Sequence, residues 1–100
     1  MAKMSINVPH HLEREVALAR IKELLPQVKE KQKDRIQDLT EKWNGNVCTF
    51  GFTVKSLKIS GRLEVNHSAV QLDGEIPWTI ALLKGIIERT IRTEAEKLLA

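Results

Sequence analysis

The chain has 100 residues, of which 42% are hydrophobic and 29% are charged. This length suits one domain, which we predict to span 1–100 with a core that needs no disulfide or metal, and it excludes multi-domain enzyme architectures. The composition is that of an ordinary soluble globular protein and not of a disordered chain. The net charge of +3 is spread along the sequence, whereas nucleic-acid-binding proteins usually concentrate basic residues on one surface.

Three sequence features bear on the location of the protein. The longest apolar stretch with almost no charge, 76–83, is far shorter than the roughly 20 residues that a membrane-spanning helix needs. The first residues lack the apolar segment of a secretory signal. The single cysteine, Cys48, has no second cysteine in the chain to pair with. We therefore expect a cytoplasmic protein without a membrane span.

The chain opens with the alternation of a β-strand and then changes to the period of an α-helix. Up to Pro9, apolar side chains occupy every second position, which predicts a short strand with one buried face: Met4, Ile6 and Val8. From Leu12, apolar residues recur every three or four positions, which predicts an amphipathic helix over 12–42. We expect this helix to kink at Pro26, because proline removes a backbone donor, and to leave 29–35 in water.

The predicted first helix is longer than a small sheet is wide, since a helix rises about 1.5 Å per residue and neighbouring strands are about 4.8 Å apart. Besides the kink, its length leaves a homodimer contact as the lesser alternative. Trp43 closes the helix, and Gly45 suits the left-handed position that follows a helix C-terminus.

Three strands and a second helix are predicted to follow. Apolar and polar residues alternate over 47–54, 57–65 and 70–76, and the joints between these segments are short enough for hairpins. A wide apolar stripe then predicts a helix over 80–99, which Trp78 opens. The predicted fold is therefore α+β, a two-layer sandwich of order β-α-β-β-β-α, with a mostly antiparallel sheet and two helices on one face.

The sequence holds no constellation of catalytic residues, and we predict that the protein is not an enzyme and has no metal or cofactor. We interpret Cys48 as a core residue, because it lies on the apolar side of its strand. The histidines are interpreted as turn residues, and the acidic pair of the third predicted meander strand as part of a solvated face: His10, His11, His67, Asp73 and Glu75.

Three glycines fall inside predicted strands: Gly51, Gly61 and Gly74. Glycine within a strand often marks a bend or the close approach of another group. We expect them to curve the sheet, and a curved sheet beneath helices can also enclose an apolar cavity. A small carrier of lipids or other hydrophobic ligands is therefore one alternative function.

The order of features along the chain resembles that of a known family. The matching segments run from the first tryptophan to the proline before the last helix: Trp43-Asn-Gly-Asn-Val47, Phe50, Gly61-Arg-Leu-Glu-Val65, Val70-Gln-Leu72 and Pro77. Together with an amphipathic C-terminal helix and an early helix rich in Ala, Arg, Glu and Leu, this order resembles the polyhydroxyalkanoic acid system family. Its members are small bacterial proteins linked with polyhydroxyalkanoate storage granules. The stretch 26–38 is longer and more charged than the family pattern.

The resemblance implies an accessory role at a hydrophobic polyester inclusion in the cytoplasm, with no catalytic residues to carry over. The expected partners are the granule surface or granule proteins. Tryptophan at the end of an element can lie half-buried at a boundary between apolar and aqueous phases. Our candidates for apolar surface contact are Trp43, Trp78, Leu82 and Ile86.

A nucleic-acid-binding module is the remaining alternative, although we consider a nucleic-acid partner the weaker prediction. It depends on the most basic stretch of the chain, whose four positive side chains are the candidate polyanion contacts: Lys29, Lys31, Lys33 and Arg35. Binding of that kind weakens steeply with added salt.

Overall fold

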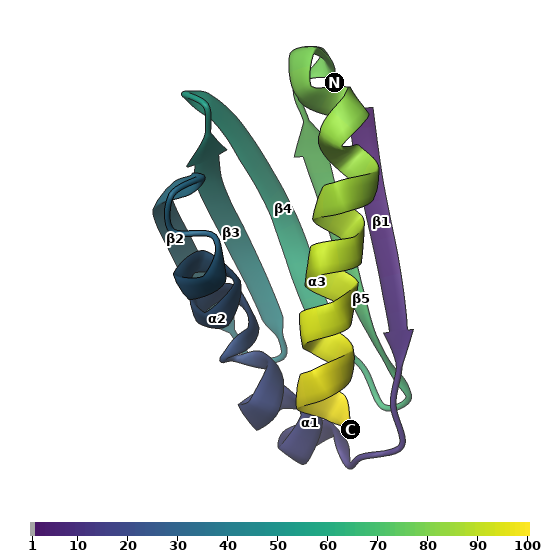
Figure 1. Ribbon diagram of the computed structural model, residues 1–100. Helices are drawn as coiled ribbons and strands as arrows, with labels where there is room; N and C mark the ends of the chain where they lie inside the picture. The colour runs from purple at the N-terminus through teal and green to yellow at the C-terminus, as the bar shows by residue number, and fades with distance from the viewer. Residues whose placement is uncertain (1) are drawn as a thin grey trace.

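The computed structural model describes residues 2–100, which form a five-stranded sheet and helices packed against it (Figure 1). The strands lie in the order β1-β5-β4-β3-β2, and each pairs antiparallel with its neighbours. Their bounds are β1 Ala2–Pro9, β2 Ile36–Asn44, β3 Val47–Val54, β4 Leu57–Val65 and β5 Ala69–Ile76. The sheet is thus a four-stranded meander, β2 to β5, with β1 added beside β5.

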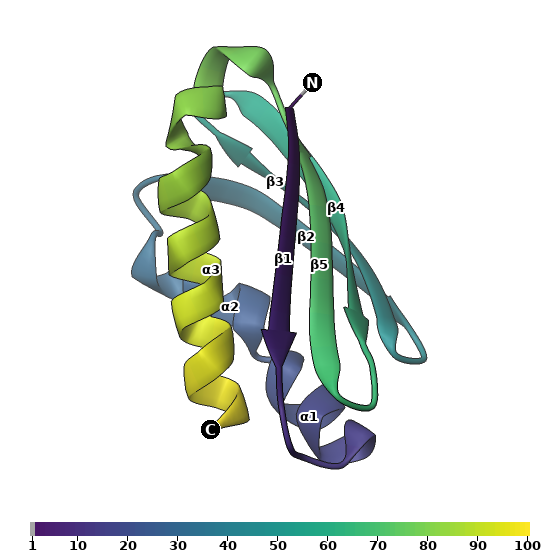
Figure 2. The same cartoon turned by 90° about the vertical axis from the view of Figure 1, so that its right-hand side faces the viewer.

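The helices are α1 Arg14–Ile21, α2 Leu24–Lys31, the 3₁₀ helix η1 Trp78–Leu83, and α3 Lys84–Leu99. Figures 1 and 2 show α2 and α3 on the same face of the sheet, with α2 beside β2 and β3 and α3 running along β5 and β1. The short helix α1 lies at the end of the sheet where β1 stops, and it contacts β4 and α3. The predicted α+β class is confirmed. No helix within 2–100 has the length and apolar character needed to cross a membrane.

Four of the five strands match the predicted alternation. In β1, every second side chain turns toward the helices and is buried, as the sequence pattern predicted. The same holds for β3, β4 and β5, whose inward side chains are buried except for the half-buried Leu57 and Gly61 of β4. These inward side chains form the sheet's share of the core, and among the most completely buried are Met4, Ile6, Cys48, Ile59, Leu63, Val65, Leu72 and Ile76.

The predicted helix over 12–42 is wrong, because this segment forms two short helices and a strand. The first helix ends at Ile21, and α2 begins anew at Leu24 after Lys22 and Glu23. Pro26 therefore lies in the first turn of α2. Backbone N–H groups in a first turn have no partner within the helix, so proline costs little there and does not produce the predicted kink.

The segment 36–44, predicted to continue that helix, is the edge strand β2. A β-bulge explains why its pattern suggested a helix. The register with β3 shifts between Gln37 and Thr40, and Asp38 adopts a positive φ of 55°. The extra residue places Ile36 and Leu39 three positions apart although both are half-buried, which is helical spacing produced by a strand.

The predicted end of that helix, at Trp43 and Gly45, is also wrong. Trp43 lies in β2 and does not close a helix, and Gly45 lies in the tight hairpin between β2 and β3, where its φ is +63°. Asn44 still pairs with Val47, so the two loop residues are Gly45 and Asn46. A two-residue loop with glycine at its first position suits a type II′ turn, and Gly-Asn between alternating segments is a hairpin signal. Gly45-Asn46 was therefore the available signal for the fifth strand. The order predicted as β-α-β-β-β-α becomes β-α-α-β-β-β-β-α with η1 before the last helix.

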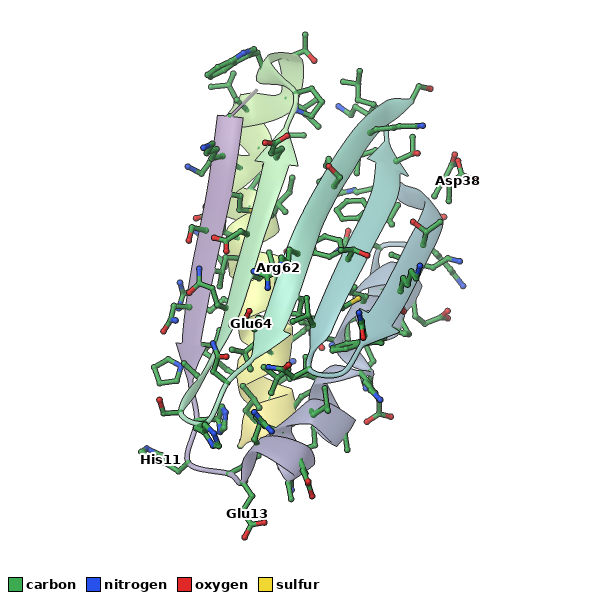
Figure 3. The ribbon with its side chains drawn as sticks, turned by 180° about the vertical axis from the view of Figure 1, so that it is seen from behind. His11, Glu13, Asp38, Arg62 and Glu64 are labelled. Atoms are coloured by element: carbon green, nitrogen blue, oxygen red, sulfur yellow. The ribbon has the colours of Figure 1, made fainter. Side chains whose placement is uncertain are left out.

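The face of the sheet turned away from the helices is polar (Figure 3). Between β1 and β5, Ser5 donates a hydrogen bond to Asp73 at 3.0 Å, and Gln71 donates to both of them. On β4, Arg62 and Glu64 form an ion pair at 2.9 Å. Glutamine and aspartate therefore serve as cross-strand links on this face, in agreement with the solvated face predicted for Asp73.

Candidate functional site

Three large apolar side chains are exposed along η1 and the first turn of α3. Trp78 is 71% exposed, Leu82 is 97% exposed and Ile86 is 56% exposed. They follow one another at four-residue intervals, and we call them the apolar patch. Their neighbours Ile80, Leu83 and Ile87 turn toward the core instead. Because Leu82 is nearly fully exposed, its side chain contributes almost no apolar burial to the stability of the monomer. The patch therefore marks a surface that another apolar phase can cover.

The structure does not bring Trp43 to the apolar patch. Trp43 lies near the hairpin end of β2, whereas Trp78 follows the carboxyl end of β5, and the strand registers place these at opposite ends of the sheet. The Trp43 indole N–H donates to the Glu41 carboxylate at 3.1 Å, and the Lys22 ammonium lies 5.7 Å from its ring centroid. Trp43 is half-buried against the core. Of the four predicted contact residues, the structure therefore groups three.

An apolar groove lies beside the patch, between α2 and α3 and above the edge of the sheet formed by β2 and β3. Its volume is about 110 Å³, and it is partly open to solvent. Most of its walls are aliphatic or aromatic: Leu25, Val28, Ile36, Leu39, Phe52, Val54, Leu83, Ile86, Ile87 and Ile91. Ile86 belongs to both surfaces, so the groove and the apolar patch are continuous.

The four basic residues predicted as polyanion contacts divide between different surroundings. All four are exposed. Lys29 and Arg35 line the groove, together with the polar side chains of Gln32 and Thr90. Lys31 and Lys33 each have an acidic neighbour: the Lys31 ammonium lies 2.5 Å from the Glu94 carboxylate, and Lys33 lies 4.0 Å from Glu30. Two cations of the basic stretch thus line the groove, and the other two form ion pairs.

Glu94 is the one buried carboxylate among residues 2–100, and it ties α3 to α2. A carboxylate removed from water needs a compensating partner, and Lys31 supplies it from α2. Lys97, 3.8 Å away on the next turn of α3, adds a second positive charge. The hydrogen bond to Glu94 raises the pKa of Lys31. This pair links the two helices that form walls of the groove.

Two side chains with chemical capacity, Cys48 and His10, are used in the structure itself. Cys48 is fully buried in the core, as predicted, and burial raises the pKa of its thiol. His10 is also buried: its Nδ1 accepts from the Leu12 backbone N–H at 3.1 Å, so Nε2 carries the proton and donates to the Asn66 carbonyl at 2.9 Å. His10 thereby joins the β1–α1 loop to the β4–β5 hairpin. Residues 2–100 contain no cluster of three metal-ligating side chains.

The cavity that the strand glycines suggested is not beneath them. Gly51 faces the outer side of the sheet. Gly61 faces the helices, but the ring of Phe50 lies against it, so close that an added Cβ would stand 2.6 Å from that ring. Gly74 is similarly covered by the end of the Met4 side chain. Gly61 and Gly74 therefore make room for core side chains, and the empty space lies elsewhere, in the groove.

The groove is not apparent from the sequence, because the pattern over 36–42 predicts a helix. Ile36 and Leu39 form the β2 wall of the groove, and they were expected to continue a helical stripe. The Gly45-Asn46 hairpin signal favoured a strand in this segment. No feature of the sequence predicts that α2 and α3 stand far enough apart over this strand to leave a groove.

Comparison with known proteins gives one family. Residues 4–99 match the polyhydroxyalkanoic acid system protein family (PHA_gran_rgn). A search of curated proteins finds no match to the chain. The family match covers nearly all of the sequence, including every strand that contributes to the core. The chain therefore belongs to the polyhydroxyalkanoic acid system protein family.

Proposed function

We propose that this protein is a non-enzymatic binding protein of polyhydroxyalkanoate storage granules in the cytoplasm, and that it contacts the polyester through the apolar patch. The observation that carries this proposal is the exposure of Trp78, Leu82 and Ile86 in one short segment. Family membership supports the granule as the apolar phase. Trp43 is left out of the contact surface, because it lies at the other end of the sheet.

The patch is suited to a granule surface on energetic grounds. Moving a leucine side chain from water to an apolar phase contributes about 2 kcal/mol, and a tryptophan side chain contributes at least as much. Because Leu82 is almost fully exposed in the free protein, nearly all of this free energy is available for binding. The fold does not need to open to present these side chains.

A binding role also agrees with how the reactive groups are used. The Cys48 thiol is enclosed in the core, and both ring nitrogens of His10 bond to the backbone. Nucleophilic and acid–base catalysis need such groups to reach a substrate. The apolar patch is exposed in the free protein and has no covering partner there. This favours a binding role over catalysis.

The test is co-sedimentation of the purified protein with amorphous polyhydroxyalkanoate granules at low and high salt. We expect the parent protein to bind with little dependence on salt, since apolar burial drives the contact. Leu82→Ser should weaken binding by about thirtyfold, which corresponds to about 2 kcal/mol. Val16→Ser is the matched control, because Val16 is an exposed apolar residue of α1, 41% exposed, outside the patch.

Two results would contradict the proposal. The first is sedimentation of Leu82→Ser equal to that of the parent protein. The second is binding that disappears at high salt, which would indicate contacts through charged groups. Circular dichroism of both serine variants checks that the fold is kept.

A further inference from the structure

We propose that the groove between α2 and α3 binds an aliphatic carboxylic acid of medium chain length. In this complex the alkyl chain lies along the apolar walls, and the carboxylate pairs with Arg35 and Lys29. The site goes beyond the granule contact, because it uses different side chains except for Ile86.

The charge at the groove is complementary to a carboxylate. Its lining includes Lys29 and Arg35 and no aspartate or glutamate. Among the ion pairs formed by residues 2–100, neither of these two cations takes part, whereas Lys31 and Lys33 of the same stretch both do. Two cations beside an apolar wall thus lack an acidic partner, and a guanidinium can hold a carboxylate through two parallel hydrogen bonds.

The size of the groove selects the chain length. Its volume is about 110 Å³, and an apolar cavity of about 150 Å³ holds benzene. By that comparison the enclosed part takes a segment of about four carbons. The rest of the chain can lie along the open side past Leu83 and Ile86 toward the apolar patch. A chain of about eight carbons fits this arrangement, whereas the groove is too small to enclose a long fatty acid or a sterol.

The test is titration of the ¹⁵N-labelled protein with octanoate, followed by two-dimensional NMR, with 1-octanol as the uncharged probe of equal chain length. We expect saturable shifts at groove residues such as Leu39 and Ile87 and tighter binding of octanoate than of octanol. Arg35→Gln should weaken octanoate binding by about tenfold, the loss expected for one charge-assisted hydrogen bond, and leave octanol binding nearly unchanged. Lys33 is another exposed cation and does not belong to the groove lining, so Lys33→Gln should change neither.

A second pair of variants tests the apolar walls. Thr90 lines the groove, whereas Thr93, one turn further along α3, is exposed and does not belong to the groove lining. Thr90→Trp should fill the groove and abolish binding of both probes, whereas Thr93→Trp should leave both intact. A dispersed NMR spectrum confirms that each variant is folded, and Arg35→Gln tests the site independently, because it alters only an exposed side chain.

The proposal is overturned by any of three results: no saturable shifts with octanoate, octanoate binding unaffected by Arg35→Gln, or equal effects of the two tryptophan substitutions. The granule contact is tested separately. Leu82→Ser should lose granule binding and keep octanoate binding, so a protein that sediments with granules and ignores octanoate refutes the groove site alone.

Discussion

Replacing Gly61 by alanine should strongly destabilise the fold, because the space for a Cβ is already occupied. Gly61 pairs with Phe50 on β3 and Gly74 on β5. A Cβ at this position would stand 2.4 Å from the Asp73 carbonyl oxygen and 2.6 Å from the Phe50 ring. The ring can turn only into a packed core, and the carbonyl belongs to the backbone, so relief requires the strands themselves to shift.

The magnitude follows from comparing the three strand glycines. Overpacking of a core costs about 1–3 kcal/mol, whereas loss of glycine's freedom in the unfolded chain stabilises by about 0.5 kcal/mol. For Gly61→Ala we expect an overpacking cost near the upper end of this range, and therefore a net loss of about 2–2.5 kcal/mol. At Gly74 the nearest atom is the flexible end of Met4 at 3.1 Å, with the Ser60 carbonyl at 3.3 Å, so we expect a loss of about 1 kcal/mol.

Gly51 is the control for this series, because its contacts would be ordinary. An added Cβ would lie 3.4 Å from the Thr40 hydroxyl on the outer face, so Gly51→Ala should be neutral or slightly stabilising. Urea denaturation gives the free energy of unfolding of each variant. For a domain of this size the Gly61 loss corresponds to a fall in Tm of about 10–20 °C. A Gly61→Ala variant as stable as Gly51→Ala would falsify the packing of Phe50 against Gly61.

Three further predictions rest on single features of the structure. Lys55 and Ser56 both have positive φ, 52° and 67°, in the β3–β4 hairpin. Asparagine and glycine adopt this conformation more readily, so the double substitution Lys55→Asn and Ser56→Gly should raise the free energy of unfolding by about 1–2 kcal/mol in urea denaturation. An unchanged free energy of unfolding would contradict the left-handed turn. Burial raises the pKa of Cys48, so the folded state holds the thiol proton more tightly than the unfolded state. The free energy of unfolding should therefore fall as the pH rises above about 9, and Cys48→Ala should lose that part of the pH dependence. The same pH dependence in Cys48→Ala as in the parent protein would be inconsistent with this reasoning. His10→Ala removes two hydrogen bonds of a buried ring and should lower the free energy of unfolding by about 1–3 kcal/mol. Amide hydrogen exchange at Asn66 and Leu12 should become faster than in the parent protein. Faster exchange elsewhere, with unchanged exchange at these two residues, would speak against this role of His10.

Much of the sheet could be predicted from the sequence because alternation is a local property. In β3, β4 and β5 each inward residue is apolar and most outward residues are polar, so the pattern specifies the strand and its buried face at once. The sequence of β2 does not show this pattern, because its bulge and the half-buried Glu41 interrupt the alternation of apolar and polar residues. A sequence pattern does not distinguish a bulged edge strand from a helix when the bulge adds one residue to the spacing.

The candidate site was predictable in part. The position of Trp78 after Ile-Pro, at the opening of the last helical segment, singled out the region where the structure exposes Leu82 and Ile86. Their role in contact with a granule stays a prediction. The groove and the division of the basic stretch into paired and groove-lining cations could not be predicted, because both depend on where α2 stands relative to α3.

The sequence by itself determined the α+β class, the inward face of four strands and the burial of Cys48, since each depends on residues that are near neighbours in the chain. Only the tertiary structure decided which apolar residues of the last helical segment are covered. Ile86 and Ile91 are the same residue type five positions apart, yet Ile86 is 56% exposed and Ile91 is buried. The difference lies in the partners that surround each position, and these come from segments far apart in the chain: burial is set by packing between elements, which local sequence does not encode.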